Sequence, residues 1–301
     1  MSGKSFLPTA FLLAACAPQV APSAPAATPT GSTLATACAG RDGWSDAAPP
    51  AKIFGNSYYV GTCGISAILI DASGGLVLID TATEEAAPSI LANIRALGFD
   101  PKNVRYLLAS HEHYDHVGGL KTLQDATGAT IVARHEAVAT LTSGEPEARD
   151  PQRGAITPFS GVTVAGQLRD GEVLPIAGLR LTIHATPGHT PGSTSWTWRS
   201  CEGSDCRTMA YIDSLSAVSA EGYRFGDHPG YVAMFRSTFA QVAKLPCDIL
   251  VTPHPGGSNL FARLAGTAPL VDAKGCQTYA EGASKRLDDR LAKEDAARAA
   301  P

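Results

Sequence analysis

The sequence lacks both an excess of positive charge and, beyond its first 15 residues, a long apolar run. Its 301 residues include 24 Lys and Arg against 28 Asp and Glu, which gives a formal net charge of −4. No basic stripe of the kind that phosphate backbones require is present, so the composition argues against nucleic-acid binding. No run after residue 15 approaches the length of a membrane-spanning helix. With 44% apolar residues, the chain instead has the composition of a globular protein with a substantial core.

Histidine is also scarce, and its distribution is the most informative feature of the chain. Four metal-capable side chains fall within six residues of the sequence: His111, His113, Asp115 and His116. They follow the apolar segment Val104 to Ala109. If that segment is a strand, His111 and His113 point the same way, while Asp115 and His116 lie on the turn beyond it and can face a second ion. Imidazole with one carboxylate and no thiolate suits zinc better than magnesium or calcium, although iron and manganese also accept such sites.

Two further histidines lie in turns rich in glycine and proline. His189 follows the strand-like run Leu179 to Ala185, and His254 follows the run Cys247 to Val251. Loops that leave a rigid sheet commonly carry functional side chains. Chance clustering on a solvated loop could explain one His-x-His pair but not the whole pattern. The remaining histidines are expected to be structural or solvated: His135, His184 and His228.

Three motifs together resemble the metallo-β-lactamase superfamily: His111-x-His113-x-Asp115-His116, Gly188-His189-Thr190-Pro191-Gly192 and the late His254. The resemblance covers Ile53 to Leu291. Within the superfamily the chain most resembles subclass B3, through three further stretches: Asp213-Ser214-Leu215-Ser216, Thr252-Pro253-His254-Pro255-Gly256 and a C-terminal helix at Tyr279 to Ala283. The first of these has serine where B1 enzymes carry a zinc-ligating cysteine.

The resemblance implies a cofactor of two zinc ions, with His111, His113 and His189 on the first and Asp115, His116 and His254 on the second. It implies that a metal-bound hydroxide hydrolyses the β-lactam ring of penicillins, cephalosporins and carbapenems and so confers antibiotic resistance. Asp115 is expected to orient that hydroxide as well as to ligate the second zinc. The resemblance also places Ser214 and Ser216 beside the metals, where they bind water or the substrate's carboxylate.

Other functions of the same residues remain open. In glyoxalase II-like thioesterases an aspartate near Asp213 bridges both metals, so a thioesterase or a lactonase is the main alternative. A non-enzymatic exported zinc protein is disfavoured, because structural zinc sites usually have four protein ligands and three per ion leave open positions. Asp80, which ends the run Leu76 to Ile79, is expected to be a buried carboxylate that braces the metal loop.

The N-terminus predicts export. Residues 1–16 have a positive charge followed by a short apolar segment, which is typical of a secretory signal. They end in Leu13-Ala14-Ala15-Cys16, which resembles a bacterial lipobox with Cys16 as the lipidated residue. An ordinary signal cut nearby is the alternative. We expect an Ala- and Pro-rich tether over 17–37, a catalytic domain over 38–301, and a periplasmic location with an outer-membrane anchor through Cys16.

The six remaining cysteines form an even set in a compartment that permits disulfides. Cys201 and Cys206 flank a tight turn and are expected to pair. The resemblance supports Cys247 with Cys276, which leaves Cys38 with Cys63.

Strand-like and helical runs alternate along the chain. The helix predicted over Glu84 to Leu97 ends at Gly98, a plausible C-cap, and another is predicted over Tyr231 to Lys244. Strands are predicted at Ile53 to Val60, Gly64 to Ile70, Leu76 to Ile79, Val104 to Ala109, Ala129 to Ala133, Val162 to Leu168, Leu179 to Ala185, Thr194 to Trp198 and Thr208 to Ile212. This order resembles the superfamily's α/β fold, an αββα sandwich of two mixed sheets with helices on the outer faces. We expect a monomer whose partner is a small-molecule β-lactam.

Overall fold

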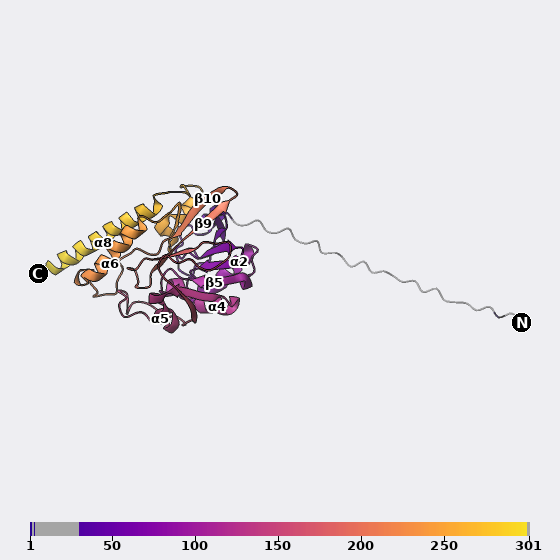
Figure 1. Cartoon of the computed structure of the whole chain (residues 1–301), viewed down its shortest axis with the longest axis horizontal. Coiled ribbons are helices and arrows are strands. Elements are labelled where there is room, and N and C mark those ends of the chain that lie inside the picture. The colour runs from indigo at the N-terminus through magenta and orange to yellow at the C-terminus, as the bar shows by residue number, and fades with distance from the viewer. Residues whose placement is uncertain (2, 4–29, 300–301) are drawn as a thin grey trace.

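A computed structural model describes residues 1, 3 and 30–299 of the chain (Figure 1). The predicted signal, its Cys16 and most of the predicted tether lie outside these residues. In the described part of the chain, no helix combines the length and the apolar character that crossing a membrane requires.

The prediction that the tether extends to residue 37 is wrong. Gly31–Ala37 form helix α1, in which the Thr30 hydroxyl caps the first turn by accepting a hydrogen bond from the Thr33 backbone N–H. Leu34 is fully buried in the core, and Gly31 packs so closely on Leu264 that a Cβ would lie 2.1 Å from the Leu264 carbonyl oxygen. This packing against a distant helix is why composition alone misplaced the boundary.

The strands form two mixed sheets, as predicted. The seven-stranded sheet runs in the order β1 (Ala51–Phe54), β2 (Ser57–Tyr59), β3 (Ile68–Ala72), β4 (Gly75–Ile79), β5 (Val104–Leu108), β6 (Thr130–Arg134) and β7 (Val164–Leu168). The four-stranded sheet runs β11 (Ile249–Val251), β10 (Asp205–Tyr211), β9 (Thr194–Glu202) and β8 (Thr182–Ala185). Strands β1 to β4 pair antiparallel and β4 to β7 parallel, whereas in the second sheet only β10 and β11 are parallel.

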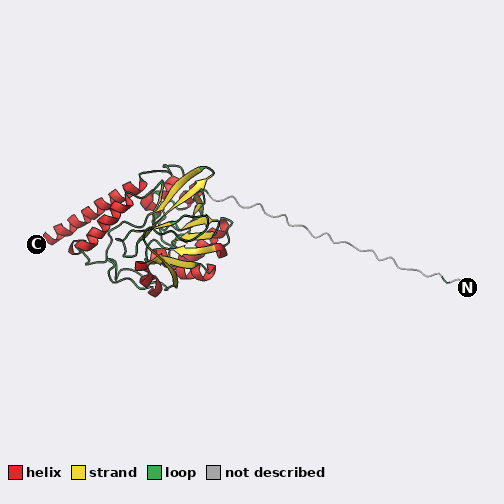
Figure 2. Cartoon of the chain, in the orientation of Figure 1, coloured by secondary structure: helices red, strands yellow, loops and turns green. Residues whose placement is uncertain are grey.

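The helices cover the outer faces of both sheets (Figure 2). The α-helices are α2 (Ala87–Ala96), α3 (Tyr114–Val117), α4 (Leu120–Thr127), α5 (His135–Ser143), α6 (Pro229–Val242), α7 (Leu260–Leu264) and α8 (Gly275–Ala299). Short 3₁₀ turns are η1 (Glu84–Ala86), η2 (Pro101–Asn103), η3 (Phe225–Asp227) and η4 (Pro255–Ser258). Helices α6 and α8 lie side by side at one end of the molecule, and α2 and α4 lie at the other (Figure 1).

Three clusters of buried apolar side chains hold these layers together. Strand residues alternate between them, because successive side chains point to opposite faces of a sheet. In β3, Ile68 and Ile70 face the cluster between the two sheets, and Leu69 faces the cluster under α2, α4 and α5. A third cluster joins the four-stranded sheet to Phe235 of α6 and Leu287 of α8. The predicted αββα sandwich is therefore confirmed.

One predicted strand is wrong. Ile53 to Val60 was expected to be continuous, but β1 and β2 form a hairpin that turns at Gly55 and Asn56. Gly55 has φ +55°, a left-handed conformation that glycine tolerates best, and a Cβ there would lie 2.4 Å from the Ser200 hydroxyl. The pair Gly55-Asn56 between two apolar runs is itself a hairpin signal, so this turn could have been predicted from the sequence.

Three disulfides link segments of the described part of the chain. The pairs are Cys38–Cys63, Cys201–Cys206 and Cys247–Cys276, separated by 25, 5 and 29 residues. They join α1 to the loop before β3, the two strands of the β9–β10 hairpin, and the segment before β11 to the start of α8. Such bridges stabilise a fold by roughly 2–4 kcal/mol each, mainly by restricting the unfolded chain.

Candidate metal centre

The histidine-rich motif begins where β5 ends. The chain leaves the sheet after Leu108, and Asp115 and His116 lie in the short helix α3, where a turn was expected. His111, His113, Asp115 and His116 are all buried. The buried imidazoles have little contact with water and keep a fixed orientation.

The fold brings two distant histidines to this motif. The ring of His189 lies 4.6 Å from the ring of His111 and 5.0 Å from that of His113, and the ring of His254 lies 5.1 Å from that of His116. His189 is carried by the loop between β8 and β9, and His254 by the loop after β11. The ends of strands from both sheets therefore meet at one edge of the sandwich.

Two groups of side chains could each hold a metal ion. The potential ligand atoms of His111, His113 and His189 lie within 4.8 Å of one another, which matches the first predicted set. The same spacing also groups His111 with Asp115 and His116. The predicted third member of the second set, His254, has its Nε2 atom 3.5 Å from Asp115 Oδ2, so it borders that group.

Each imidazole is held from behind through its other nitrogen. The hydrogen bonds run from His111 Nδ1 to Asp213 Oδ1 (2.8 Å), from His113 Nε2 to Asp150 Oδ2 (2.9 Å), from His116 Nδ1 to Asp80 Oδ2 (3.2 Å), from His189 Nδ1 to the Ser216 carbonyl (2.9 Å) and from His254 Nδ1 to the Gly64 carbonyl (3.2 Å). These acceptors fix the tautomer of each ring. When such a ring is neutral, its second nitrogen is left as a lone-pair donor, as in metal sites.

The centre contains polar atoms that the described residues do not satisfy. His111 Nε2 is buried without a hydrogen-bond partner, and His116 Nε2 lies 3.1 Å from Asp115 Oδ2 without hydrogen-bond geometry. Buried polar atoms without partners are costly and rare, so these two nitrogens fit the role of metal ligands. The donor set of imidazole nitrogens and one carboxylate fits zinc.

Burial and neighbouring side chains shift the pKa values of His189, His111 and Asp115 in the directions that suit metal ligands. Burial and the neighbouring His113 lower the pKa of His189 to about 3, and burial together with His116 holds the pKa of His111 well below its ordinary value. Both rings are therefore neutral at pH 7. Burial alone would raise the pKa of Asp115, but His116, His254 and His113 outweigh it and hold that pKa well below the ordinary range.

Asp80 lies at the end of β4 and contacts several parts of the centre. It is fully buried, and Oδ1 accepts a hydrogen bond from the Ser110 backbone N–H at 2.6 Å. Its Oδ2 accepts hydrogen bonds from the Ser110 hydroxyl at 2.7 Å and from Tyr211 at 2.6 Å, besides the one from His116. Its φ of +61° is unusual for a non-glycine residue and is typical of strained functional positions.

The two serines predicted to bind substrate follow β10. Ser214 is buried, and Ser216 lies behind His189, with its Oγ atom 3.2 Å from His189 Nδ1. The Ser216 carbonyl accepts a hydrogen bond from that same nitrogen at 2.9 Å. Ser216 therefore supports a metal-facing imidazole as well as lying beside the centre.

Sequence reasoning missed two carboxylates. Asp150 was not singled out, because it lies in the long loop after α5, 37 residues from His113. Glu112 was passed over inside the motif itself. The three other histidines lie away from the centre: exposed His135 bonds Gln167, His184 bonds the Thr197 hydroxyl, and His228 stacks on Tyr223.

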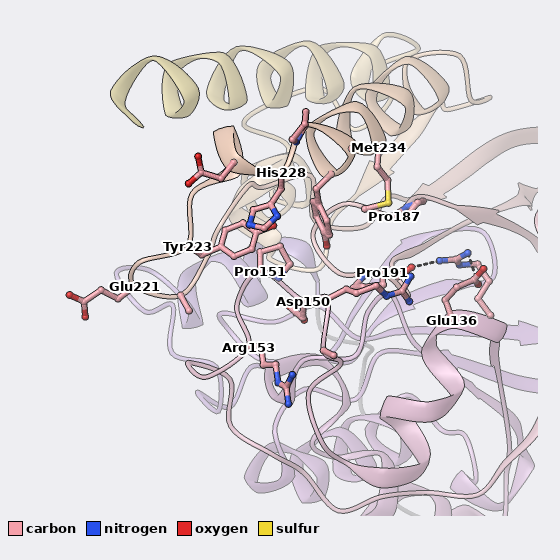
Figure 3. A pocket seen from close by; sticks show the side chains of 18 residues that line it. Glu136, Asp150, Pro151, Arg153, Pro187, Pro191, Glu221, Tyr223, His228 and Met234 are labelled. Atoms are coloured by element: carbon pink, nitrogen blue, oxygen red, sulfur yellow. Dashed lines mark hydrogen bonds and ion pairs between the residues drawn. The ribbon is translucent and has the colours of Figure 1, made fainter. Parts of the chain in front are cut away.

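A cavity of about 1110 Å³ lies between the loop around Asp150 and the loop that holds Pro187 and Pro191 (Figure 3). Its walls include Asp150, Pro187, Pro191, Tyr223 and Met234, and none of the six predicted metal ligands lines it. Pro187 and Pro191 flank His189 in sequence, so the cavity adjoins the loop that carries this histidine. We therefore place the chemistry at the histidine cluster.

Comparison with known proteins agrees with this geometry. A model of the metallo-β-lactamase superfamily matches residues 60–202. The chain is 53% identical to the metallo-β-lactamase MIM-1 from Novosphingobium pentaromativorans, with 89% of this chain and 100% of that chain covered and a TM-score of 0.87. It is 41% identical to MEM-A1, a subclass B3 metallo-β-lactamase isolated from a soil metagenome library, with 84% and 99% covered and a TM-score of 0.81.

A more distant similarity links the chain to thioester hydrolases. The hydroxyacylglutathione hydrolase of Rhodopseudomonas palustris (strain BisB18) is 28% identical over 216 residues, which cover 67% of this chain and 71% of that protein. Both the identity and the covered share of this chain are lower than for the two lactamase structures.

Proposed function

The chain belongs to the subclass B3 metallo-β-lactamases, and we propose that it hydrolyses β-lactam antibiotics with two zinc ions held at the edge of the sandwich. One observation carries the proposal: five imidazoles and one carboxylate converge from both sheets, and each ring is oriented by an acceptor behind it. Orientation of this kind is what metal ligands require.

We assign three ligands to each ion. His111, His113 and His189 would hold the first zinc, and Asp115, His116 and His254 the second. Three protein ligands per ion leave a coordination position open to water or substrate, which is typical of catalytic rather than structural zinc. His254 is the most exposed of the six, with 45% of its side chain accessible, and so would lie nearest to the entrance.

When bound, zinc supplies Lewis acidity, which lowers the pKa of water from about 15.7 to about 7 and polarises carbonyl oxygens. The protein's own part is positioning. The Asp115 carboxylate would accept a hydrogen bond from the attacking water and so aim its oxygen at the ring carbonyl. That oxygen adds to the carbonyl carbon, the C–N bond of the ring breaks, and the nitrogen takes up a proton. No residue needs to form an acyl-enzyme.

Substrate orientation would come from the segment after β10. Penicillins, cephalosporins and carbapenems carry a carboxylate beside the ring, and the hydroxyls of Ser214 and Ser216 would donate hydrogen bonds to it. The Ser216 carbonyl already accepts the hydrogen of His189 Nδ1, which frees the Ser216 hydroxyl to donate elsewhere.

Hydrolysis of a chromogenic cephalosporin by the purified protein is the direct test. We expect turnover that a zinc chelator abolishes and added zinc restores. The second candidate, a thioesterase or lactonase, is favoured by the similarity to hydroxyacylglutathione hydrolases. A protein that left every β-lactam intact while cleaving a glutathione thioester or an acyl lactone would overturn the lactamase assignment.

A further inference from the structure

Glu112 lies between two metal-facing histidines but points the other way. It is 2% exposed, and the rings of His111 and His113 on either side of it lie 4.8 Å apart on the metal side. Its Oε2 accepts a hydrogen bond from the Thr190 hydroxyl at 2.9 Å, and its Oε1 accepts one from the Gly192 backbone N–H at 3.0 Å. Its carboxylate therefore contacts the loop that carries His189.

The His189 loop is shaped to receive this carboxylate. A Cβ on Gly192 would lie 2.5 Å from both Glu112 oxygens, so any larger residue would displace this carboxylate. Thr190 directly follows His189, and its backbone N–H donates to the Ser193 hydroxyl at 3.0 Å. The two contacts of Glu112 thus lie one and three residues after the imidazole.

The contacts of Glu112 are unusual for a buried carboxylate. Within the described residues, no lysine or arginine forms an ion pair with it. A buried carboxylate without a cationic partner is costly and depends on its hydrogen bonds. The loop at Thr190 and Gly192 supplies both, so this loop and the metal motif are held in one arrangement.

We propose that Glu112 is a positioning residue that fastens the His189 loop to the His111–His113 segment and thereby sets the geometry of the first metal site. The inference rests on the proposed function, since it takes these three histidines as ligands of one zinc ion. Glu112 itself touches neither metal nor substrate. It acts through His189, whose ring must lie within coordination distance of the same ion as His111 and His113, which are 78 and 76 positions away in sequence.

Zinc affinity is the measurement that tests this role, because it does not depend on which substrate is cleaved. Glu112→Leu removes both hydrogen bonds, and we expect it to weaken the first zinc by about 10- to 100-fold, the usual effect of losing a residue that supports a ligand. Glu112→Gln keeps an acceptor for the Gly192 N–H and an amide for Thr190, so it should stay within about threefold of wild type. Thr190→Val removes one contact only and should give an intermediate loss.

Two comparisons separate positioning from general damage. In chelator competition, Glu112→Leu should resemble His189→Ala, which lacks a first-site ligand, rather than His254→Ala. The matched control is Glu294→Leu. Glu294 is also a buried carboxylate, 7% exposed, and it accepts hydrogen bonds from two backbone N–H groups, those of Phe225 and Gly226, neither of which contacts a predicted metal ligand through a hydrogen bond. That control should leave the affinity for both ions unchanged.

The possible outcomes are distinct from those for the lactamase activity. Equal zinc affinity in wild type, Glu112→Leu and Thr190→Val would overturn the positioning role, whether or not β-lactams are hydrolysed. Equal losses in Glu112→Gln and Glu112→Leu would also overturn it, because the amide preserves the contacts. If Glu112→Leu failed to fold, Thr190→Val against Glu112→Gln would still decide the question.

Discussion

One carboxylate oxygen of Asp213 lies behind His111, on the Nδ1 side of its ring. Its Oδ1 accepts a hydrogen bond from His111 Nδ1 at 2.8 Å, while the nitrogen that faces the centre is Nε2. A carboxylate that bridged two metals would have to lie on the Nε2 side of that ring. The position of Asp213 therefore argues for the lactamase and against the thioesterase arrangement, in which an aspartate near this point bridges the metals.

Asp213→Asn tests that distinction. We expect the variant to retain two zinc ions, because Asn can still accept a hydrogen bond from His111, and to lose about 10- to 100-fold in kcat/KM as the ring becomes less firmly oriented. Elemental analysis and cephalosporin hydrolysis measure the two quantities. A loss of bound zinc from Asp213→Asn would mean that the carboxylate is a ligand after all.

The two distant histidines should each control one ion. His189→Ala should weaken the first zinc and His254→Ala the second, because each completes a set of three and has no neighbour to replace it. Zinc per chain after dialysis against a weak chelator is the readout. His135→Ala, which removes an exposed imidazole outside the cluster, should keep both ions. Asp115→Asn should reduce turnover more than His254→Ala, because Asp115 also orients the attacking water.

Ser216→Ala should impair substrate binding with the metals in place. Loss of one hydrogen bond usually costs about 0.5–1.5 kcal/mol, which corresponds to a roughly two- to tenfold rise in KM for a cephalosporin or carbapenem. Zinc content should not change, since the Ser216 carbonyl that holds His189 remains. Ser204→Ala, on the exposed β9–β10 turn, is the matched control. An unchanged KM would remove Ser216 from the substrate site.

Glu294 should make stability depend on pH. It anchors the loop after Ser216 through Phe225 and Gly226, and it pairs with Arg290 at 2.6 Å. Burial alone would raise the pKa of Glu294, but the hydrogen bonds from Gly226 and Arg290 outweigh it and lower that pKa. A carboxyl with a lowered folded-state pKa stabilises the fold above its ordinary pKa, and this stabilisation is lost as the pH falls through the folded value.

Glu294→Gln should therefore lower the free energy of unfolding by about 1.5–3 kcal/mol near pH 7, the range for hydrogen bonds to a charged group. The difference from wild type should shrink as the pH falls below about 4. Thermal unfolding across this pH range measures both effects, and zinc content should stay the same. Glu281→Gln, on the same helix but exposed, is the control. A difference that grew at low pH would contradict the sign of the pKa shift.

Export and anchoring through Cys16 remain a proposal from the sequence motif. In a Gram-negative host the full chain should partition with membranes, and Cys16→Ser should release it or leave it unprocessed. Mass spectrometry of the mature N-terminus provides the check. An unmodified chain beginning at another residue would exclude the lipid anchor while leaving export intact.

The sequence by itself determined the local features of this protein. The helix predicted over Glu84 to Leu97 ends at Ala96, with Leu97 as its C-cap and Gly98 at φ +85°, because the stop signal lies within the helix's own neighbourhood. The motif from His111 to His116 and the turns around His189 and His254 were readable for the same reason. Each is a short continuous stretch in which residue types and spacing already imply metal chemistry.

Only the tertiary structure decided which group accepts the hydrogen bond from each metal-facing imidazole. His111 pairs with Asp213 across 102 residues, and His254 pairs with the Gly64 carbonyl across 190. Such partners carry no local signature, since any buried acceptor at the right place would serve, and a backbone carbonyl has no residue type at all. Their positions follow from the packing of two sheets whose strand ends meet at one edge. The sequence therefore specifies the ligands, and the sandwich specifies their orientation.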